Sequence, residues 1–113
     1  MAESCLFCRI ASGEIPSQLV YESPLCIAFR DVAPKAPVHV LVIPREHVTS
    51  LDTATDAALV GELALAAAQV ARTEGIAASG YRVVTNIGDD GGQSVSHLHF
   101  HVLGGRPMTW PPG

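Results

Sequence analysis

Short runs of apolar and β-branched residues recur along the chain, and glycine, proline or acidic residues separate them. This pattern predicts strands of four to nine residues. The runs cover residues 19–22, 25–29, 38–43, 81–86 and 95–103. The first two flank Ser23-Pro24, which are residues typical of turns, so a hairpin is expected there. Pro44 ends the third run, because proline cannot donate to a strand ladder.

One long segment has helical rather than strand periodicity. It begins at Thr53, a good N-cap residue, and runs through an Ala- and Leu-rich stretch to Gly75. An apolar stripe is expected along one side of this helix, formed by Leu59, Leu63, Leu65, Ala66 and Val70. Residues 7–13 predict a short first helix or turn. Together the elements predict an α+β fold, a mainly antiparallel sheet with one dominant helix on one face.

Composition narrows the class of protein. The 113 residues suit a single domain, 1–113, and 48% apolar with 16% charged residues excludes a disordered chain. A net charge of −4 without a basic run argues against nucleic acid as partner. We expect no membrane span, because no apolar stretch reaches about 20 residues. Three cysteines without a visible secretory signal favour the reducing cytoplasm.

The last predicted strand contains three histidines spaced by two: His97, His99 and His101. On a strand, all three imidazoles would lie on one face, roughly 6–7 Å apart, with Leu98 and Phe100 facing a core. The residues alone leave a metal site, imidazole catalysis and packing open. His39 in another predicted strand, and His47 just after it, extend the set of histidines that can converge.

Residues 91–94, Gly-Gly-Gln-Ser, directly precede the histidines. Glycines allow backbone N–H groups to turn toward one point, and Ser94 adds a hydroxyl donor. An ordinary glycine-rich turn is the alternative. Beside three imidazoles, the pattern favours a site that holds a phosphate against a nucleophile.

The segment GGQSVSHLHFHVLGG resembles the signature of the histidine triad (HIT) superfamily, in which three histidines alternate with apolar residues. Ile15-Pro16, Ala36-Pro37-x-His39 and Val42-Ile43-Pro44 also agree with the family. The ending GGRPMTWPPG resembles the Hint-like branch of histidine triad nucleotide-binding proteins. The resemblance implies a five-stranded antiparallel sheet with one long and one short N-terminal helix. It also implies a homodimer with a ten-stranded sheet, whose active site the irregular tail 104–113 helps to complete.

The same resemblance implies the catalytic roles. His99 would attack the α-phosphate of a nucleotide and form a nucleotidyl-histidine intermediate. His101 and Ser94 would hold the phosphate oxygens, and His101 would also serve the leaving group. A backbone carbonyl or His39 would keep the His99 proton on the far ring nitrogen. The phosphate pocket would be completed by Asn86, Gly92 and Gln93.

The resemblance further implies a nucleoside pocket. Asp31 would accept hydrogen bonds from the ribose hydroxyls, and Trp110 would reach the site of the other subunit. Candidates for the apolar base pocket are Phe7, Ile10, Phe29 and Val32, each of which is equally interpretable as ordinary core. Cys26, between two apolar residues, is interpreted as a small buried residue.

Cys5 and Cys8 form a Cys-x-x-Cys motif, which is interpretable as a zinc hook, a redox pair or a coincidence. Many HIT proteins carry this motif and bind zinc with two histidines, which here would be His47 and His97. Two thiolates and two imidazoles form a closed tetrahedral set suited to structural zinc.

The function that the resemblance implies is hydrolysis of purine nucleoside phosphoramidates, such as adenosine 5′-monophosphoramidate. A dinucleoside polyphosphate or adenylyl sulfate hydrolase is the enzymatic alternative. A nucleotide-binding adaptor with incidental activity is the alternative from another class of protein.

Overall fold

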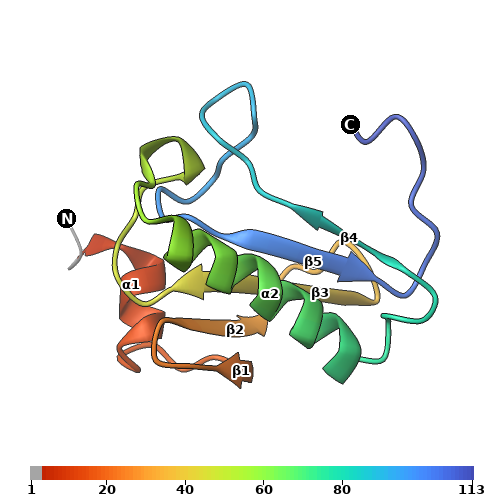
Figure 1. The fold of residues 1–113 in the computed structure, drawn as a ribbon, viewed down its shortest axis with the longest axis horizontal. Coiled ribbons are helices and arrows are strands. Elements are labelled where there is room, and N and C mark those ends of the chain that lie inside the picture. The colour runs from red at the N-terminus through yellow and green to blue at the C-terminus, as the bar shows by residue number, and fades with distance from the viewer. Residues whose placement is uncertain (1–3) are drawn as a thin grey trace.

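The computed structural model describes residues 4–113, which form one antiparallel sheet and a long helix that crosses one of its faces (Figure 1). The strands are β1 (Leu19–Glu22), β2 (Cys26–Arg30), β3 (Val38–Pro44), β4 (Tyr81–Val84) and β5 (Phe100–Gly104). The helices are α1 (Leu6–Ala11), α2 (Ala57–Thr73) and the short 3-10 helix η2 (Leu51–Thr53). The predicted five-stranded antiparallel α+β fold is therefore confirmed.

The strand order is β1-β2-β3-β5-β4, so β3 lies at the centre and β5 enters between β3 and β4. Helix α2 connects β3 to β4 and covers the sheet on the way. The pair β3–β5 matters most for the site, because its register places Leu41 opposite His101 and His39 opposite Leu103. His39 and His101 are therefore diagonal neighbours on the same face. In residues 4–113, no helix is long and apolar enough to cross a membrane.

Alternate residues of the central strands supply two separate apolar clusters. Val40 and Val42 of β3 pack against α2, whereas Leu41 and Ile43 face the opposite side. Phe7 of α1 is buried in the second cluster. The sheet thus has a closed face under α2 and a second face, partly covered by α1, on which the histidines lie.

The structure corrects two predictions about the long helix. The helix begins at Ala57, and its N-cap is Asp56, whose carboxylate accepts from the Ala58 and Leu59 amides. Thr53 instead closes η2, in a capping box with Ser50. Leu65 does not belong to the buried stripe and is 72% exposed. It follows Leu63 by two residues, about 200° around the helix, and therefore points away from the sheet.

The predicted last strand is also wrong in its length. Strand β5 begins at Phe100, so His97 and His99 lie in the extended segment before it and only His101 pairs with a neighbouring strand. Residues 91–92 lie in a turn and residues 95–97 in a bend, and the Leu98 amide donates to the Val48 carbonyl after β3. The alternation of faces nevertheless persists, since Leu98 and Phe100 pack in the cluster under α2. Cys26 is fully buried, as predicted.

Candidate functional site

His99 is fixed by the backbone two residues earlier. Its Nδ1 atom lies 2.7 Å from the carbonyl oxygen of His97, and the residue is only 4% exposed. A carbonyl oxygen can only accept, so Nδ1 must carry the proton and donate it. The Nε2 atom of neutral His99 therefore keeps its lone pair, which is the state a nucleophilic imidazole requires.

A second chain of hydrogen bonds sets the tautomers of His39 and His101. The Lys35 backbone N–H donates to His39 Nδ1 at 3.0 Å, so the proton of neutral His39 must be on Nε2. That Nε2 atom lies 2.9 Å from His101 Nδ1 and donates to it. The remaining proton of His101 is then on Nε2. One backbone amide thus makes His101 a hydrogen-bond donor through its second nitrogen.

Burial keeps these imidazoles neutral. Burial, together with the neighbouring rings of His99 and His39, lowers the pKa of His101 to about 4. Burial also lowers the pKa of His39, although the nearby Asp31 carboxylate opposes this. His39 Nε2 lies 3.4 Å from Asp31 Oδ2, farther than from His101, so its single proton belongs to the bond with His101.

Asp31, His39 and His101 offer ligand atoms within 4.8 Å of one another, which is compatible with a metal site. The tautomers argue against that use. A metal on His39 Nε2 would require the proton on Nδ1, where the Lys35 amide already points. The other oxygen of Asp31 accepts from the Ala33 amide at 2.8 Å. We therefore interpret the three residues as a hydrogen-bonded chain and not as metal ligands.

These side chains border a cavity of about 900 Å³ beside α1. Eight of the predicted site residues line it: Phe7, Ile10, Phe29, Asp31, Val32, Ser94, His99 and His101. The sequence interpretation missed several others, including Leu41, Ile15, Pro16 and Gln18. Strand alternation could have predicted Leu41, because it lies two residues after His39 on the same strand and therefore on the same face. In the segment 15–18, Ile15-Pro16 agrees with the family, but no periodicity places these residues at the cavity, since the segment has no regular structure.

The glycine-rich loop before the histidines is held by its own side chains. Asn86 Nδ2 donates to the Gly91 carbonyl at 2.6 Å. Gln93 accepts from the Gly88 amide and donates to the carbonyls of Thr49 and Val95. The Gln93 amide donates to the Gly88 carbonyl at 3.0 Å. Asn86, Gln93 and Gly92 therefore shape the loop that carries Ser94, and they do not line the cavity.

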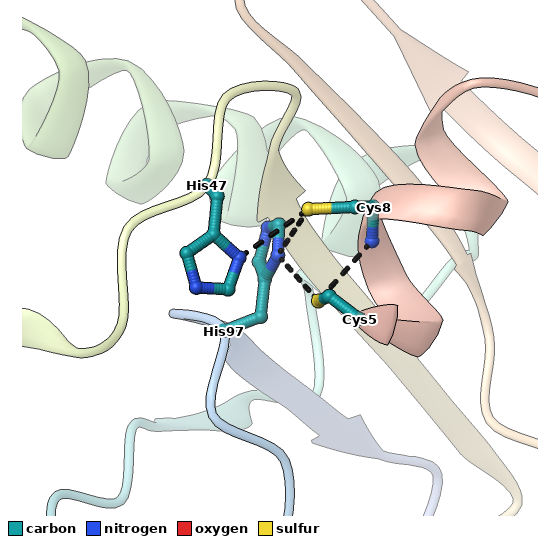
Figure 2. A group of neighbouring side chains, drawn as sticks. All are labelled: Cys5, Cys8, His47 and His97. Carbon is teal, nitrogen blue, oxygen red and sulfur yellow. Dashed lines mark hydrogen bonds between the residues drawn. The ribbon is translucent and has the colours of Figure 1, made fainter. Parts of the chain in front are cut away.

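Cys5, Cys8, His47 and His97 form a second cluster, which Figure 2 shows. Cys5 Sγ and Cys8 Sγ lie 3.3 and 3.5 Å from His97 Nδ1, and Cys8 Sγ lies 3.3 Å from His47 Nδ1. Zinc bonds of about 2.3 Å to sulfur and about 2.0–2.1 Å to nitrogen place tetrahedral ligand atoms about 3.6 Å apart. The four residues therefore fit a tetrahedral metal with only small adjustments.

The ring of His97 has the tautomer that a metal needs. Its Nε2 atom donates to the Pro44 carbonyl at 3.0 Å, which leaves the lone pair of Nδ1 directed at the two thiols. Burial lowers the pKa of His97 to about 4, so the ring is neutral. Burial and the neighbouring Cys5 thiol raise the pKa of Cys8 to about 11, so metal binding must displace the thiol proton.

Trp110 lies outside both sites in this chain. It belongs to the tail after β5 and is 81% exposed. The backbone of that tail is held to the sheet, because Arg82 donates to the Thr109 carbonyl at 2.9 Å.

Known proteins resemble this chain in both sequence and structure. Residues 12–108 match the HIT domain family. An uncharacterised HIT-like protein of Synechococcus elongatus is 52% identical to the chain, with the full length of both covered. A HIT family hydrolase from Legionella pneumophila has a similar structure, with a TM-score of 0.94 and 46% identity over 97% of this chain and 100% of that chain. A histidine triad protein from Clostridium difficile superposes with a TM-score of 0.90 and 43% identity, over 93% of each chain. The chain belongs to the HIT family.

Proposed function

We propose that the protein hydrolyses purine nucleoside phosphoramidates through a nucleotidyl-histidine intermediate on His99. One observation carries the proposal: the bond from His99 Nδ1 to the His97 carbonyl leaves Nε2 unprotonated at the edge of the large cavity. HIT family hydrolases from Legionella pneumophila and Clostridium thermocellum, 46% and 45% identical to this chain, support a hydrolytic role.

The reaction would proceed in two displacements. His99 Nε2 bonds to phosphorus as the phosphorus–nitrogen bond breaks, and the amine leaves with the bonding electrons and one proton from water. A second water then attacks phosphorus, the phosphorus–Nε2 bond breaks, and the monophosphate is released with neutral His99. The proton that this water loses balances the proton taken by the amine. His101 Nε2–H donates to the leaving nitrogen or to a phosphate oxygen, and Ser94 donates to another.

The apolar side of the cavity would hold the nucleoside. Phe7, Ile10, Phe29 and Val32 offer surface for a purine ring, and Asp31 offers a carboxylate for the ribose hydroxyls. A ring system among apolar side chains and a few directed polar groups is the usual composition of a small-molecule site.

We also propose zinc at Cys5, Cys8, His47 and His97, where it would fix α1 against the segment before β5. The reduced thiols that such a site needs agree with a cytoplasmic location. A homodimer through α2 and β4 would cover the exposed Leu65, Val83 and Trp110. Light scattering at micromolar concentration should give twice the mass of the chain, and a monomer would contradict this part of the proposal.

The function is tested with adenosine 5′-monophosphoramidate as substrate. His99→Ala should reduce kcat by at least 10³-fold while circular dichroism shows an unchanged fold. The wild-type protein, quenched in acid-free conditions during turnover, should carry one nucleotidyl group, which the variant lacks. Unchanged hydrolysis by the variant would refute the assignment of His99. Faster cleavage of diadenosine polyphosphate or adenylyl sulfate than of the phosphoramidate would instead favour the alternative hydrolase.

A further inference from the structure

The metal-ligand cluster and the His99 site share a side chain at their boundary. Phe7 lies on α1 between Cys5 and Cys8, and it is 5% exposed. Its ring contacts His97 edge-on, with centroids 5.9 Å apart, and His99 edge-on, with centroids 5.1 Å apart. It also lines the cavity proposed for the nucleoside. Phe7 is therefore close in sequence to Cys5 and Cys8, and its ring contacts His99, the proposed nucleophile.

His97 connects the same two sites through its own atoms. Its ring Nδ1 faces the two cysteine sulfurs, and its carbonyl oxygen accepts the proton of His99 Nδ1. The ring is also held by the Pro44 carbonyl, which accepts from its Nε2 atom at 3.0 Å. A displacement of the His97 backbone would therefore change both its position beside the cysteines and the hydrogen bond to His99.

The fourth residue of the cluster is coupled to this segment as well. Val48 follows His47, and its carbonyl accepts from the Leu98 amide at 2.6 Å, between His97 and His99. Cys8, His47 and His97 thus each adjoin, or themselves provide, a group that contacts the chain around His99, and Cys5 lies two residues before Phe7.

Helix α1 is short, and besides Phe7 only the partly buried Ile10 and Ala11 of this helix pack against the cluster below it. It has six residues, and an isolated helix in water needs about 12–15 to be even marginally stable. Its one buried residue is Phe7, whose ring also contacts Phe29 of β2 with centroids 5.5 Å apart. The cysteines on either side of Phe7 are the points at which a metal would add a further restraint on that ring. Metal bonds at both cysteines would supply the restraint that six residues cannot supply themselves.

We propose that metal occupancy of the Cys5, Cys8, His47 and His97 cluster controls the reaction site, with Phe7 and His97 as the positioning residues that transmit it to His99. Loss of the metal releases α1, removes the Phe7 wall from the cavity and loosens the hydrogen bond of His99, while the sheet under α2 remains folded. This inference rests on the proposed role of His99. It adds that loss of the metal weakens nucleoside binding and displaces His99 at the same time.

The test uses the full-length protein loaded with zinc, stripped of metal by chelation, and reloaded with zinc chloride. Two readouts need no turnover: the downfield Nδ1–H proton resonance of His99 in 15N-histidine-labelled protein, and calorimetric binding of adenosine monophosphate. We expect metal removal to broaden or abolish the resonance and to weaken binding at least tenfold, with both restored by zinc. Circular dichroism should show that the sheet persists.

Phe7→Ala provides a second test that does not depend on the stability of the metal-free protein. With zinc bound, Phe7→Ala should still lose the His99 resonance and at least tenfold in affinity, and Phe7→Leu should retain more of both. Cys26→Ala is the matched control for Cys8→Ala, because Cys26 is buried on the opposite face. Only Cys8→Ala should reproduce the effects of chelation.

Metal removal or Phe7→Ala that leaves the resonance unchanged and the affinity within twofold would overturn the inference. Failure of the proposed function would look different, because His99→Ala would then retain hydrolysis whatever the metal content. The resonance and the affinity report the coupling even if His99 is not the nucleophile.

Discussion

His39 and His101 share one proton, which lies between two nitrogens 2.9 Å apart on neighbouring strands. The proton is bound to His39 Nε2, because the Lys35 amide donates to Nδ1 on the other side of the His39 ring. The donor that His101 presents to the cavity is therefore set by a backbone group on the loop before β3.

Removal of His39 should impair the reaction more than binding. His39→Leu leaves His101 Nδ1 without a donor, so His101 can adopt the wrong tautomer and present a lone pair to the leaving group. We expect kcat to fall by about 10²-fold with KM changed less than threefold. His39→Gln keeps a side-chain N–H and should recover part of the rate in the same steady-state assay. Equal rates for His39→Leu and the wild type would show that His101 does not act as a donor.

Asp31 should contribute mainly to binding. Asp31→Asn keeps the oxygen that accepts from the Ala33 amide, and so preserves the turn, but it removes the charge proposed to accept from both ribose hydroxyls. We expect KM for the phosphoramidate to rise about tenfold with kcat within threefold. The matched measurement uses a 2′,3′-dideoxy substrate, on which wild type and variant should differ little. A large loss on both substrates would place Asp31 in the chemistry instead.

The histidines should make the fold less stable in mild acid. The native pKa of His101 is about 4, whereas an unfolded histidine titrates near 6.5, so the unfolded state binds more protons between these values. Stability should therefore fall as the pH is lowered from 6.5 to 4, by on the order of 1–3 kcal/mol from this residue. The free energy of unfolding in urea is measured for the wild type and His101→Gln at pH 7 and pH 4.5. The difference between the two proteins isolates the contribution of His101, because all other groups titrate in both proteins. An identical pH dependence in the two proteins would contradict it.

Substitution of alanine for two glycines should change the stability of the protein in opposite directions. A Cβ at Gly91 would collide with the Ile87 backbone, so Gly91→Ala must displace the loop that carries Ser94. We expect it to weaken binding of adenosine monophosphate at least threefold and to lower the melting temperature. Gly61 lies within α2 with open space around it, and Gly61→Ala should stabilise the protein by roughly 0.5–1 kcal/mol. Calorimetry on the two variants provides both comparisons.

Local sequence patterns predict much of this fold. The parts that they do not predict depend on contacts between residues far apart in the sequence. The alternation around His99 predicted which residues face the core, and this prediction holds although the hydrogen-bonded strand starts only at Phe100. The hydrogen bonds of Gln93 to Gly88 and Thr49 were not predictable from the sequence, because that pairing depends on how the loop closes. The Lys35 amide has no sequence signal at all, since any residue except proline supplies one.

The neutrality of His39 and His101 has a consequence for how an anionic substrate reaches the cavity. Among the described residues that line the cavity, Arg30 is the only arginine or lysine, and both of its terminal nitrogens bond to Glu74 on the far side of the sheet. The described lining therefore offers an anionic nucleotide no unpaired cationic side chain, in a chain whose net charge is −4. Capture depends on close-range donors and on shape, and a rise in ionic strength should not slow association, because it screens no attraction between opposite charges.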